Sequence, residues 1–238
     1  MNAYEQARSL SSSDQNISIA FKPIEQIFED KKIKPDACIM VYGVYNAGKS
    51  TLINVLLGHE EARVGDIPMT DQVDSYRWGK YSILDTPGVD APIEHEQVTK
   101  AQMLKADVII FVVNPLGTIE EEATLNVLVD LLVEKKQIFM VFNDKNGLTD
   151  QDFIKLKDQT REQLQKIGYQ RGLNNILKEV PIVRINAQFA FIGQTENQPE
   201  LIEASGYPIL KNQLEEFLDT IFKFSFALYV SSASILIS

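Results

Sequence analysis

The stretch Gly43-Val44-Tyr45-Asn46-Ala47-Gly48-Lys49-Ser50-Thr51 fits the pattern G-x-x-x-x-G-K-[S/T], in which a glycine-rich loop binds phosphate groups. The apolar run at residues 37–42 precedes it and predicts a buried strand. Residues 50–57 follow it with leucine and isoleucine at helical spacing. Strand, glycine loop and helix in this order form the context in which the pattern is functional.

The residue types in this loop suit an anionic ligand. Gly43 and Gly48 allow backbone conformations closed to other residues, so that N–H groups can face phosphate oxygens. The following helix adds about half a positive charge at its N-terminus. Lys49 brings a full charge to the β- and γ-phosphates, and the Ser50 hydroxyl can bind magnesium. The alternative, a glycine turn followed by a surface lysine, fits the flanking strand and helix poorly. The loop residues expected to contact a nucleotide are Gly43, Tyr45, Asn46, Ala47, Gly48, Lys49, Ser50 and Thr51.

The composition limits the possible domain number, ligands and cellular location. The chain has 238 residues, 45% of them hydrophobic, which suits one α/β domain or one domain with an appendage. Its net charge of −10 makes it a poor general binder of nucleic acid. With Cys38 as the single cysteine, it has no intramolecular disulfide and no thiolate metal cluster. Residues 1–20 are polar and serine-rich, which argues against a signal peptide and for the cytoplasm.

A second motif ends the second strand of a predicted antiparallel hairpin, formed by residues 73–78 and 81–84. It reads Asp85-Thr86-Pro87-Gly88. The Asp85 carboxylate can hold a magnesium-bound water, and the Gly88 amide can meet a γ-phosphate. Thr70, between the two motifs, can complete the magnesium shell. The alternative is an ordinary turn, but the phosphate loop one hairpin earlier favours a functional motif.

The rest of the chain alternates strands and helices. Strands are predicted at residues 108–113, 137–142 and 181–185, and helices at 118–133, from Thr149 onward and at 207–222. This alternation predicts a mostly parallel sheet with ligands at the carboxyl ends of its strands, where all the candidate motifs lie. We expect three parts: a lead-in at 1–36 with a short helix at 23–32, a nucleotide-binding domain at 37–222, and an apolar segment at 223–238.

Several motifs together carry a family resemblance. They are the loop with the following Leu52-Ile53-Asn54-Val55-Leu56-Leu57-Gly58, the segment Val64-Gly65-Asp66-Ile67-Pro68-Met69-Thr70, and Asp85-Thr86-Pro87-Gly88-Val89. In these motifs, residues 37–222 resemble the Era-like class of small GTPases, near its ribosome-binding members and the bacterial dynamin-like GTPases.

The resemblance implies a P-loop NTPase fold with three Ras-like layers, whose mostly parallel six-stranded sheet has one antiparallel strand. It implies a nucleotide-dependent switch that hydrolyses GTP to GDP and phosphate with magnesium, with Lys49, Thr70, Asp85 and Gly88 as its catalytic residues. Ser50 and Thr70 would bind magnesium directly, and Asp85 through water. Such a protein could also form a homodimer across its nucleotide face.

The motif that reads the base departs from the family pattern. Where the family has Asn-Lys-x-Asp, this chain has Asn143-Asp144-Lys145-Asn146. Asn146 replaces the family aspartate, and loss of its charge-assisted hydrogen bond to the base costs about 1.5–3 kcal/mol, or roughly 10- to 150-fold in affinity. We therefore expect weaker discrimination between bases, with phosphate binding retained. The lysine that packs over the base is replaced by Asp144, and Asn186-Ala187-Gln188 matches the later loop in part. The base contacts implied by the family are Asn143, Lys145, Asn146, Asn186 and Ala187.

Val89 stands where Ras-like proteins carry a glutamine that orients the attacking water. Hydrolysis would then depend on charge stabilisation and on a group from elsewhere. In potassium-activated members, the loop asparagine that matches Asn46 helps to hold a potassium ion near the phosphates. We therefore expect potassium as a second cation, and faster turnover in potassium than in sodium buffer.

Residues 224–237 are apolar or small and carry no charge. This run is shorter than the roughly 18–20 residues that span a bilayer. Three interpretations compete: a helix packed on the N-terminal segment, the start of a stalk or membrane-facing region in a chain truncated here, and a partner interface. For the whole chain, the alternatives to a GTPase switch are a nucleotide-binding scaffold that hydrolyses little and the G domain of a dynamin-like membrane-remodelling protein, peripheral at a membrane.

Overall fold

The computed structural model describes residues 15, 18, 19, 22, 37–44, 46–62, 74–85, 103, 105–115, 122–173 and 180–235. The chain divides into two units, Met1–Asp36 and Ala37–Ser238. In the first unit the four described residues are helical, and the helix predicted at 23–32 lies outside the described residues.

Six strands form one sheet in the second unit. They are β1 (Ala37–Gly43), β2 (Asp74–Trp78), β3 (Tyr81–Asp85), β4 (Val108–Val113), β5 (Gln137–Asn143) and β6 (Ile182–Ile185), in the order β2-β3-β1-β4-β5-β6. All neighbours are parallel except β2 and β3, which pair antiparallel as the hairpin predicts. The predicted P-loop fold class is confirmed, because the sheet is mostly parallel and has one antiparallel strand.

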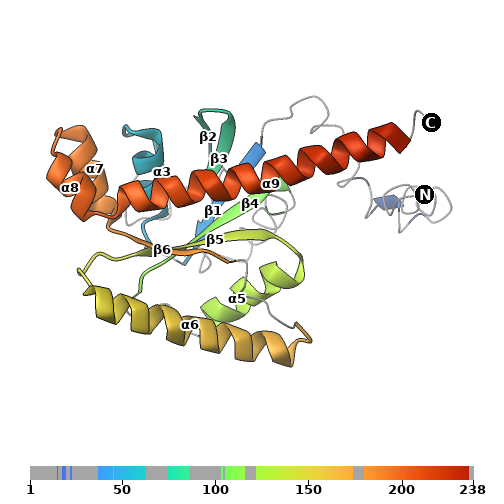
Figure 1. The fold of residues 1–238 in the computed structure, drawn as a ribbon, viewed down its shortest axis with the longest axis horizontal. Coiled ribbons are helices and arrows are strands. Elements are labelled where there is room, and N and C mark those ends of the chain that lie inside the picture. Colours follow the sequence, from blue (N-terminus) through green and yellow to red (C-terminus); the bar gives the residue numbers. More distant parts are fainter. Residues whose placement is uncertain are drawn as a thin grey trace. The chain divides into compact units, whose positions relative to one another are not determined.

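Helices cover both faces of this sheet. They are α3 (Lys49–Leu57), α5 (Glu122–Val133), α6 (Asp150–Gln170), α7 (Ala187–Thr195), α8 (Pro199–Ala204) and α9 (Tyr207–Ile235). Residues of α3, α7 and α9 pack in one core and residues of α5 and α6 in the other, so the two sets of helices cover opposite faces of the sheet and give the three predicted layers. Figure 1 shows α5 and α6 below β5 and β6.

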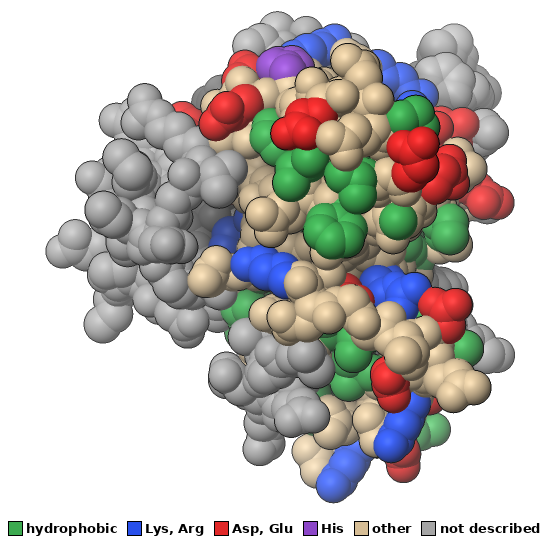
Figure 2. Space-filling view, turned by 90° about the vertical axis from the view of Figure 1, so that its left-hand side faces the viewer, with side chains coloured by type: hydrophobic (Ala, Val, Ile, Leu, Met, Phe, Trp, Pro, Cys, Tyr) green, Lys and Arg blue, Asp and Glu red, His purple; other side chains and the backbone are tan. Residues whose placement is uncertain are grey.

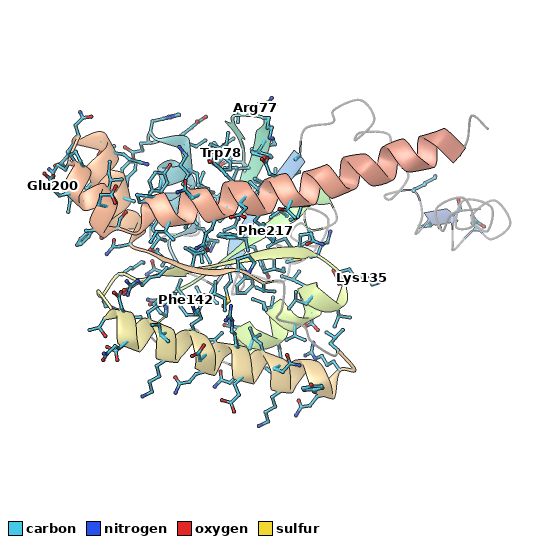
Figure 3. All side chains as sticks on the ribbon, viewed as in Figure 1. Arg77, Trp78, Lys135, Phe142, Glu200 and Phe217 are labelled. Atoms are coloured by element: carbon cyan, nitrogen blue, oxygen red, sulfur yellow. The ribbon has the colours of Figure 1, made fainter. Side chains whose placement is uncertain are left out.

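Alternate residues of the strands feed two separate cores. In β1, Ile39 and Val41 join the core under α3, α7 and α9, whereas Met40 and Tyr42 join the core over α5 and α6. This alternation is what a strand covered on both faces requires. Figure 3 shows Phe217 on the side of α9 that faces the sheet, where its ring lies 5.5 Å from that of Phe139.

Two features of the helices differ from the sequence prediction. The closing helix does not end near Phe222, because α9 continues to Ile235 without a break. Two helices, α7 and α8, occupy a stretch for which the sequence analysis predicts no element. The predicted start of α5 at residue 118 lies outside the described residues, which begin this helix at Glu122. Among the described residues, no helix is long and apolar enough to cross a membrane.

Candidate nucleotide-binding site

The glycine loop joins the carboxyl end of β1 to the N-terminus of α3, as the sequence predicts. Gly43 has φ +154°, and a Cβ there would lie 2.0 Å from the carbonyl oxygen of Val112 in β4. Gly48 has φ +88°, and its Cβ would lie 2.2 Å from Nδ2 of Asn143. Both positions therefore require glycine, since the loop is pressed against two neighbouring strands.

The lysine of the motif lies over its own loop. Lys49 Nζ donates to the carbonyl oxygens of Val44 at 3.0 Å and Gly43 at 3.3 Å. A half-buried ammonium group at the positive end of a helix is placed to meet an anion. Asn46 is exposed and Ala47 is buried in this loop, whereas Tyr45 lies outside the described residues.

Two residues predicted to hold magnesium, Ser50 in α3 and Asp85 at the end of β3, are hydrogen-bonded to each other. The Ser50 hydroxyl donates to Asp85 Oδ2 at 3.1 Å, although 35 positions separate them in the chain. The parallel pairing of β1 with β3, which sets Val41 beside Asp85, brings the two motifs to one edge. Asp85 is only 5% exposed. A hydroxyl and a carboxylate are the hard oxygen donors that magnesium prefers, so the pair fits this ion. Thr70 and Gly88 lie outside the described residues.

Asn143, at the end of β5, links the loop to α7. Its Nδ2 donates to the Ala47 carbonyl at 2.8 Å, and its Oδ1 accepts from the Ala187 N–H at 3.0 Å. The side chain is almost fully buried, so each bond satisfies a backbone group that water cannot reach. Asn143 thus holds the phosphate loop and the start of α7 together.

Asp144 and Lys145, the next two residues, differ in role: Asp144 builds a turn and Lys145 contacts the phosphate loop. The Asp144 carboxylate accepts from the backbone N–H groups of Asn146 at 3.1 Å, Gly147 at 2.9 Å and Leu148 at 2.6 Å. It is 4% exposed and builds the turn before α6. Lys145 Nζ instead reaches the phosphate loop, where it donates to the Asn46 carbonyl at 2.9 Å and to Asn46 Oδ1 at 3.3 Å. The exposed Asn146 contributes its backbone N–H to this turn.

Asn186 caps α7. Its Oδ1 accepts from the Phe189 N–H at 2.9 Å, as an N-cap side chain does. The predicted base contact of its side chain thus competes with this cap, whereas Ala187 meets Asn143 as described above. Thr51 is half-buried in the first turn of α3, next to the loop in sequence.

Two polar features near the site were not singled out from the sequence. Asn54 is fully buried in α3, where it accepts from the N–H groups of Glu61 at 3.0 Å and Ala62 at 2.7 Å and donates to the Ala62 carbonyl at 2.9 Å. It fixes the chain just before the segment that contains Thr70. Burial, together with the nearby carboxylates of Asp74 and Asp85, raises the pKa of Tyr76 to about 12. A polar residue inside an apolar helical run was the available signal for Asn54.

Comparisons with known proteins find similarity to GTPases. Residues 38–144 match the family model described as 50S ribosome-binding GTPase. GTPase Der of Persephonella marina is 31% identical over 176 residues, which are 63% of this chain and 39% of that protein. GTPase Der of Clostridium perfringens is 32% identical over 185 residues, 72% of this chain and 39% of that protein. The chain spans about two fifths of the length of these relatives.

Two solved structures share the fold. An oligomerised bacterial dynamin pair, described as a mechanism for long-range sensing and tethering of membranes, aligns with a TM-score of 0.64 and 17% identity over 98% of this chain and 55% of that chain. LeoA, a bacterial dynamin GTPase from ETEC, aligns with a TM-score of 0.62 and 20% identity over 93% of this chain and 43% of that chain. Identities this low show a common fold alone.

The sheet order, the glycine loop and the Ser50–Asp85 pair define a P-loop nucleotide-binding domain. Within that large group, the chain is similar to small GTPases of the ribosome-binding kind and to GTPase Der. GTPases of this class bind GTP, hydrolyse it to GDP and phosphate, and generally use magnesium.

Proposed function

We propose that this chain binds GTP at residues 43–51 and cleaves its β–γ phosphoanhydride bond, acting as a nucleotide-dependent switch. The observation that carries the proposal is the meeting of Ser50 with the distant Asp85 at 3.1 Å, directly beside Lys49. A loop that only turned the chain would not need a buried carboxylate from another strand at its serine.

Each residue of the site then has a defined role. Backbone N–H groups of the loop and the Lys49 ammonium would bind the phosphates and offset the charge that develops on them. The hydroxyls of Ser50 and Thr70 would hold magnesium, and Asp85 would order a water molecule on it. When bound, magnesium neutralises phosphate charge. The Gly88 amide would sense the γ-phosphate, so that its loss releases the loop.

Release of phosphate tests this proposal. Lys49→Ala should reduce GTP turnover at least about a hundredfold, because it removes the ammonium group that stabilises the transition state. Lys155→Ala removes an exposed lysine from α6 and serves as the charge-matched control, with turnover unchanged. Equal phosphate release from wild type and Lys49→Ala would contradict the enzyme assignment.

Potassium is the second cation that we propose, with Asn46 as its protein ligand. The proposal is supported by the exposed position of Asn46 in the loop and by Val89 in place of a water-orienting glutamine. Asn46 Oδ1 would exchange its 3.3 Å hydrogen bond with the Lys145 ammonium for the ion. Turnover should be faster in potassium than in sodium buffer at equal ionic strength. Equal turnover in the two buffers would exclude this role.

A nucleotide-binding scaffold with weak hydrolysis is the second candidate, and the base loop favours it. The Asp144 carboxylate is bound by three backbone N–H groups, and the neutral Asn146 stands where the family has aspartate. Calorimetric titration with GDP, XDP and ADP in magnesium buffer measures the base preference. Tight binding of more than one base, with slow phosphate release, would favour the scaffold.

The nucleotide side of the molecule also supports a proposed homodimer. Figure 2 shows hydrophobic side chains gathered on the face at the α7 and α8 end of the molecule. In these elements and the start of α9, Phe189 is 45% and Ile209 is 59% exposed. Light scattering with GDP and with a non-hydrolysable GTP analogue should show a dimer in the triphosphate state. A monomer in both states would contradict the dimer.

The C-terminal part of α9 is the proposed contact with a membrane or a protein partner. Its support is the uncharged sequence at 224–237 and the continuation of α9 to Ile235. Co-sedimentation with liposomes should require residues 224–238. Equal sedimentation of the full chain and of a chain ending at residue 223 would exclude the membrane contact.

A further inference from the structure

We propose that Asp74 is a positioning residue for magnesium: its carboxylate accepts hydrogen bonds from water molecules on the ion, beside Asp85. This inference depends on the proposed function, since it takes the Ser50–Asp85 pair as the magnesium site. It assigns a role to an exposed carboxylate at the start of β2 that belongs to neither sequence motif.

The first observation is the register of the β2–β3 hairpin. Asp74, the first residue of β2, is the register partner of Asp85, the last residue of β3. Residues directly opposite each other in an antiparallel pair have Cβ atoms about 4.5–5.5 Å apart on one face of the sheet. The two carboxylates therefore start from neighbouring positions at the end of β3, where Asp85 accepts from the Ser50 hydroxyl.

The second observation is the face of the sheet to which both side chains belong. Side chains two positions apart in a strand share a face. Tyr76, two positions after Asp74, packs in the core that contains residues of α3. Ile83, two positions before Asp85, packs in the same core. Asp74 and Asp85 are therefore both on the face covered by α3, whose first turn carries Ser50.

A cation would offset the repulsion between these two carboxylates. Like charges directly opposite each other in a sheet are destabilising, and Asp85 is only 5% exposed, so that solvent screens its charge weakly. Both charges also act on one hydroxyl, because burial, followed by the charges of Asp74 and Asp85, raises the pKa of Tyr76 to about 12. Magnesium prefers oxygen ligands and usually keeps several of its waters, so a second carboxylate beside Asp85 suits this ion.

A structural role for Asp74 is the alternative, because the Tyr76 hydroxyl donates to Asp74 Oδ2 at 3.5 Å. This distance is long for a hydrogen bond between two oxygen atoms, which usually measures about 2.5–3.0 Å. Asp74 also remains exposed. The two roles differ in what they predict for Tyr76→Phe, since loss of this hydroxyl should weaken metal binding only if Asp74 acts through it.

Manganese is the probe for the experiment, because it suits the same oxygen ligands as magnesium and is paramagnetic. Titration of manganese into the complex of the full chain with GDP, followed by electron paramagnetic resonance, gives the dissociation constant of the ion. Asp74→Asn should weaken manganese binding about fivefold, the effect expected of one exposed charge. Asp74→Glu should recover most of this loss. Asp158→Asn, at an exposed aspartate of α6, and Tyr76→Phe should both match wild type.

Equal dissociation constants in wild type and Asp74→Asn would overturn the inference, as would an equal loss in Tyr76→Phe. Without GDP and metal, Asp74→Asn should unfold at no lower urea concentration than wild type, because it removes one of two like charges. A lower midpoint would also overturn the inference, since Asp74 would then stabilise the fold itself. Manganese that binds the wild-type complex no more tightly than it binds free GDP would instead show that the proposed magnesium site is wrong.

Discussion

Replacing Gly43 by alanine tests the packing of the phosphate loop against the sheet. The new Cβ would lie 2.0 Å from the Val112 carbonyl oxygen and 2.9 Å from its carbonyl carbon. Both atoms belong to β4, where Val112 is the register partner of Gly43, so neither can move without disturbing the sheet. Overpacking of this kind costs about 1–3 kcal/mol, and an unfavourable φ costs about 1–2 kcal/mol more.

We therefore expect Gly43→Ala to lower the free energy of unfolding by about 3 kcal/mol. The matched control is Gly58→Ala, because Gly58 has φ +81° and nothing within 4 Å of its Cβ position. This control should lose only about 1 kcal/mol, the cost of the backbone conformation.

Urea unfolding followed by the fluorescence of Trp78, the single tryptophan, gives both free energies. Binding of GDP should be weakened in Gly43→Ala and retained in Gly58→Ala, since only the first change displaces the loop. Equal losses of stability in the two variants would refute the reasoning, because the contact with Val112 would then carry no cost.

Three further predictions concern polar groups near the site. Folding raises the pKa of the Tyr76 hydroxyl from about 10 to about 12, so as the pH rises the unfolded chain loses this proton before the folded chain does. The free energy of unfolding of wild type should therefore fall by up to about 2.7 kcal/mol between pH 10 and 12. Tyr76→Phe should remove this loss and Tyr169→Phe, at an exposed tyrosine, should not, as urea titrations across this range will show. Asn54→Ala should lower the free energy of unfolding by about 3 kcal/mol, because it leaves buried backbone groups without partners, and unchanged urea midpoints would contradict this. Asp144→Asn should cost about 2 kcal/mol in the same assay and speed amide exchange at residues 146–148, and equal exchange in both proteins would contradict the turn described above.

The strand, loop and helix around the phosphate motif were predictable because each has a strong local signal. The apolar runs at β1, β4 and β5 are long enough to be buried on both faces, and glycine at 43 and 48 permits the backbone of the loop. The hairpin was predictable from its two-residue link, in which Gly79 has φ +56°. These features depend on residues close together in the chain.

The helices after β6 were harder to predict. The family position of Asn186 predicts a place in the base loop, whereas its side chain caps α7, a role that asparagine also favours. Pro199 begins α8, a position that proline favours in helices. The end assigned to the closing helix near Phe222 followed a change of composition, and α9 continues because apolar and small residues do not stop a helix.

The roles of Asp144 and Lys145 could not be read from the sequence. Outside helices and strands no periodicity fixes the direction of a side chain, so the motif alone suggested that Asp144 had replaced the family lysine. The direction of Lys145 depends on three hydrogen bonds at Asp144 and on a loop 99 positions away. Contacts of this kind need the folded chain.

The central claim is that the backbone N–H groups of residues 43–50 bind a nucleotide's phosphates. Hydrogen–deuterium exchange with and without GDP and magnesium measures those groups directly. We predict that exchange slows in peptides covering 43–50, whereas α6 (Asp150–Gln170), on the opposite face of the sheet from α3, exchanges at the same rate in both conditions. Unchanged exchange at 43–50 with GDP bound would show that the nucleotide lies elsewhere.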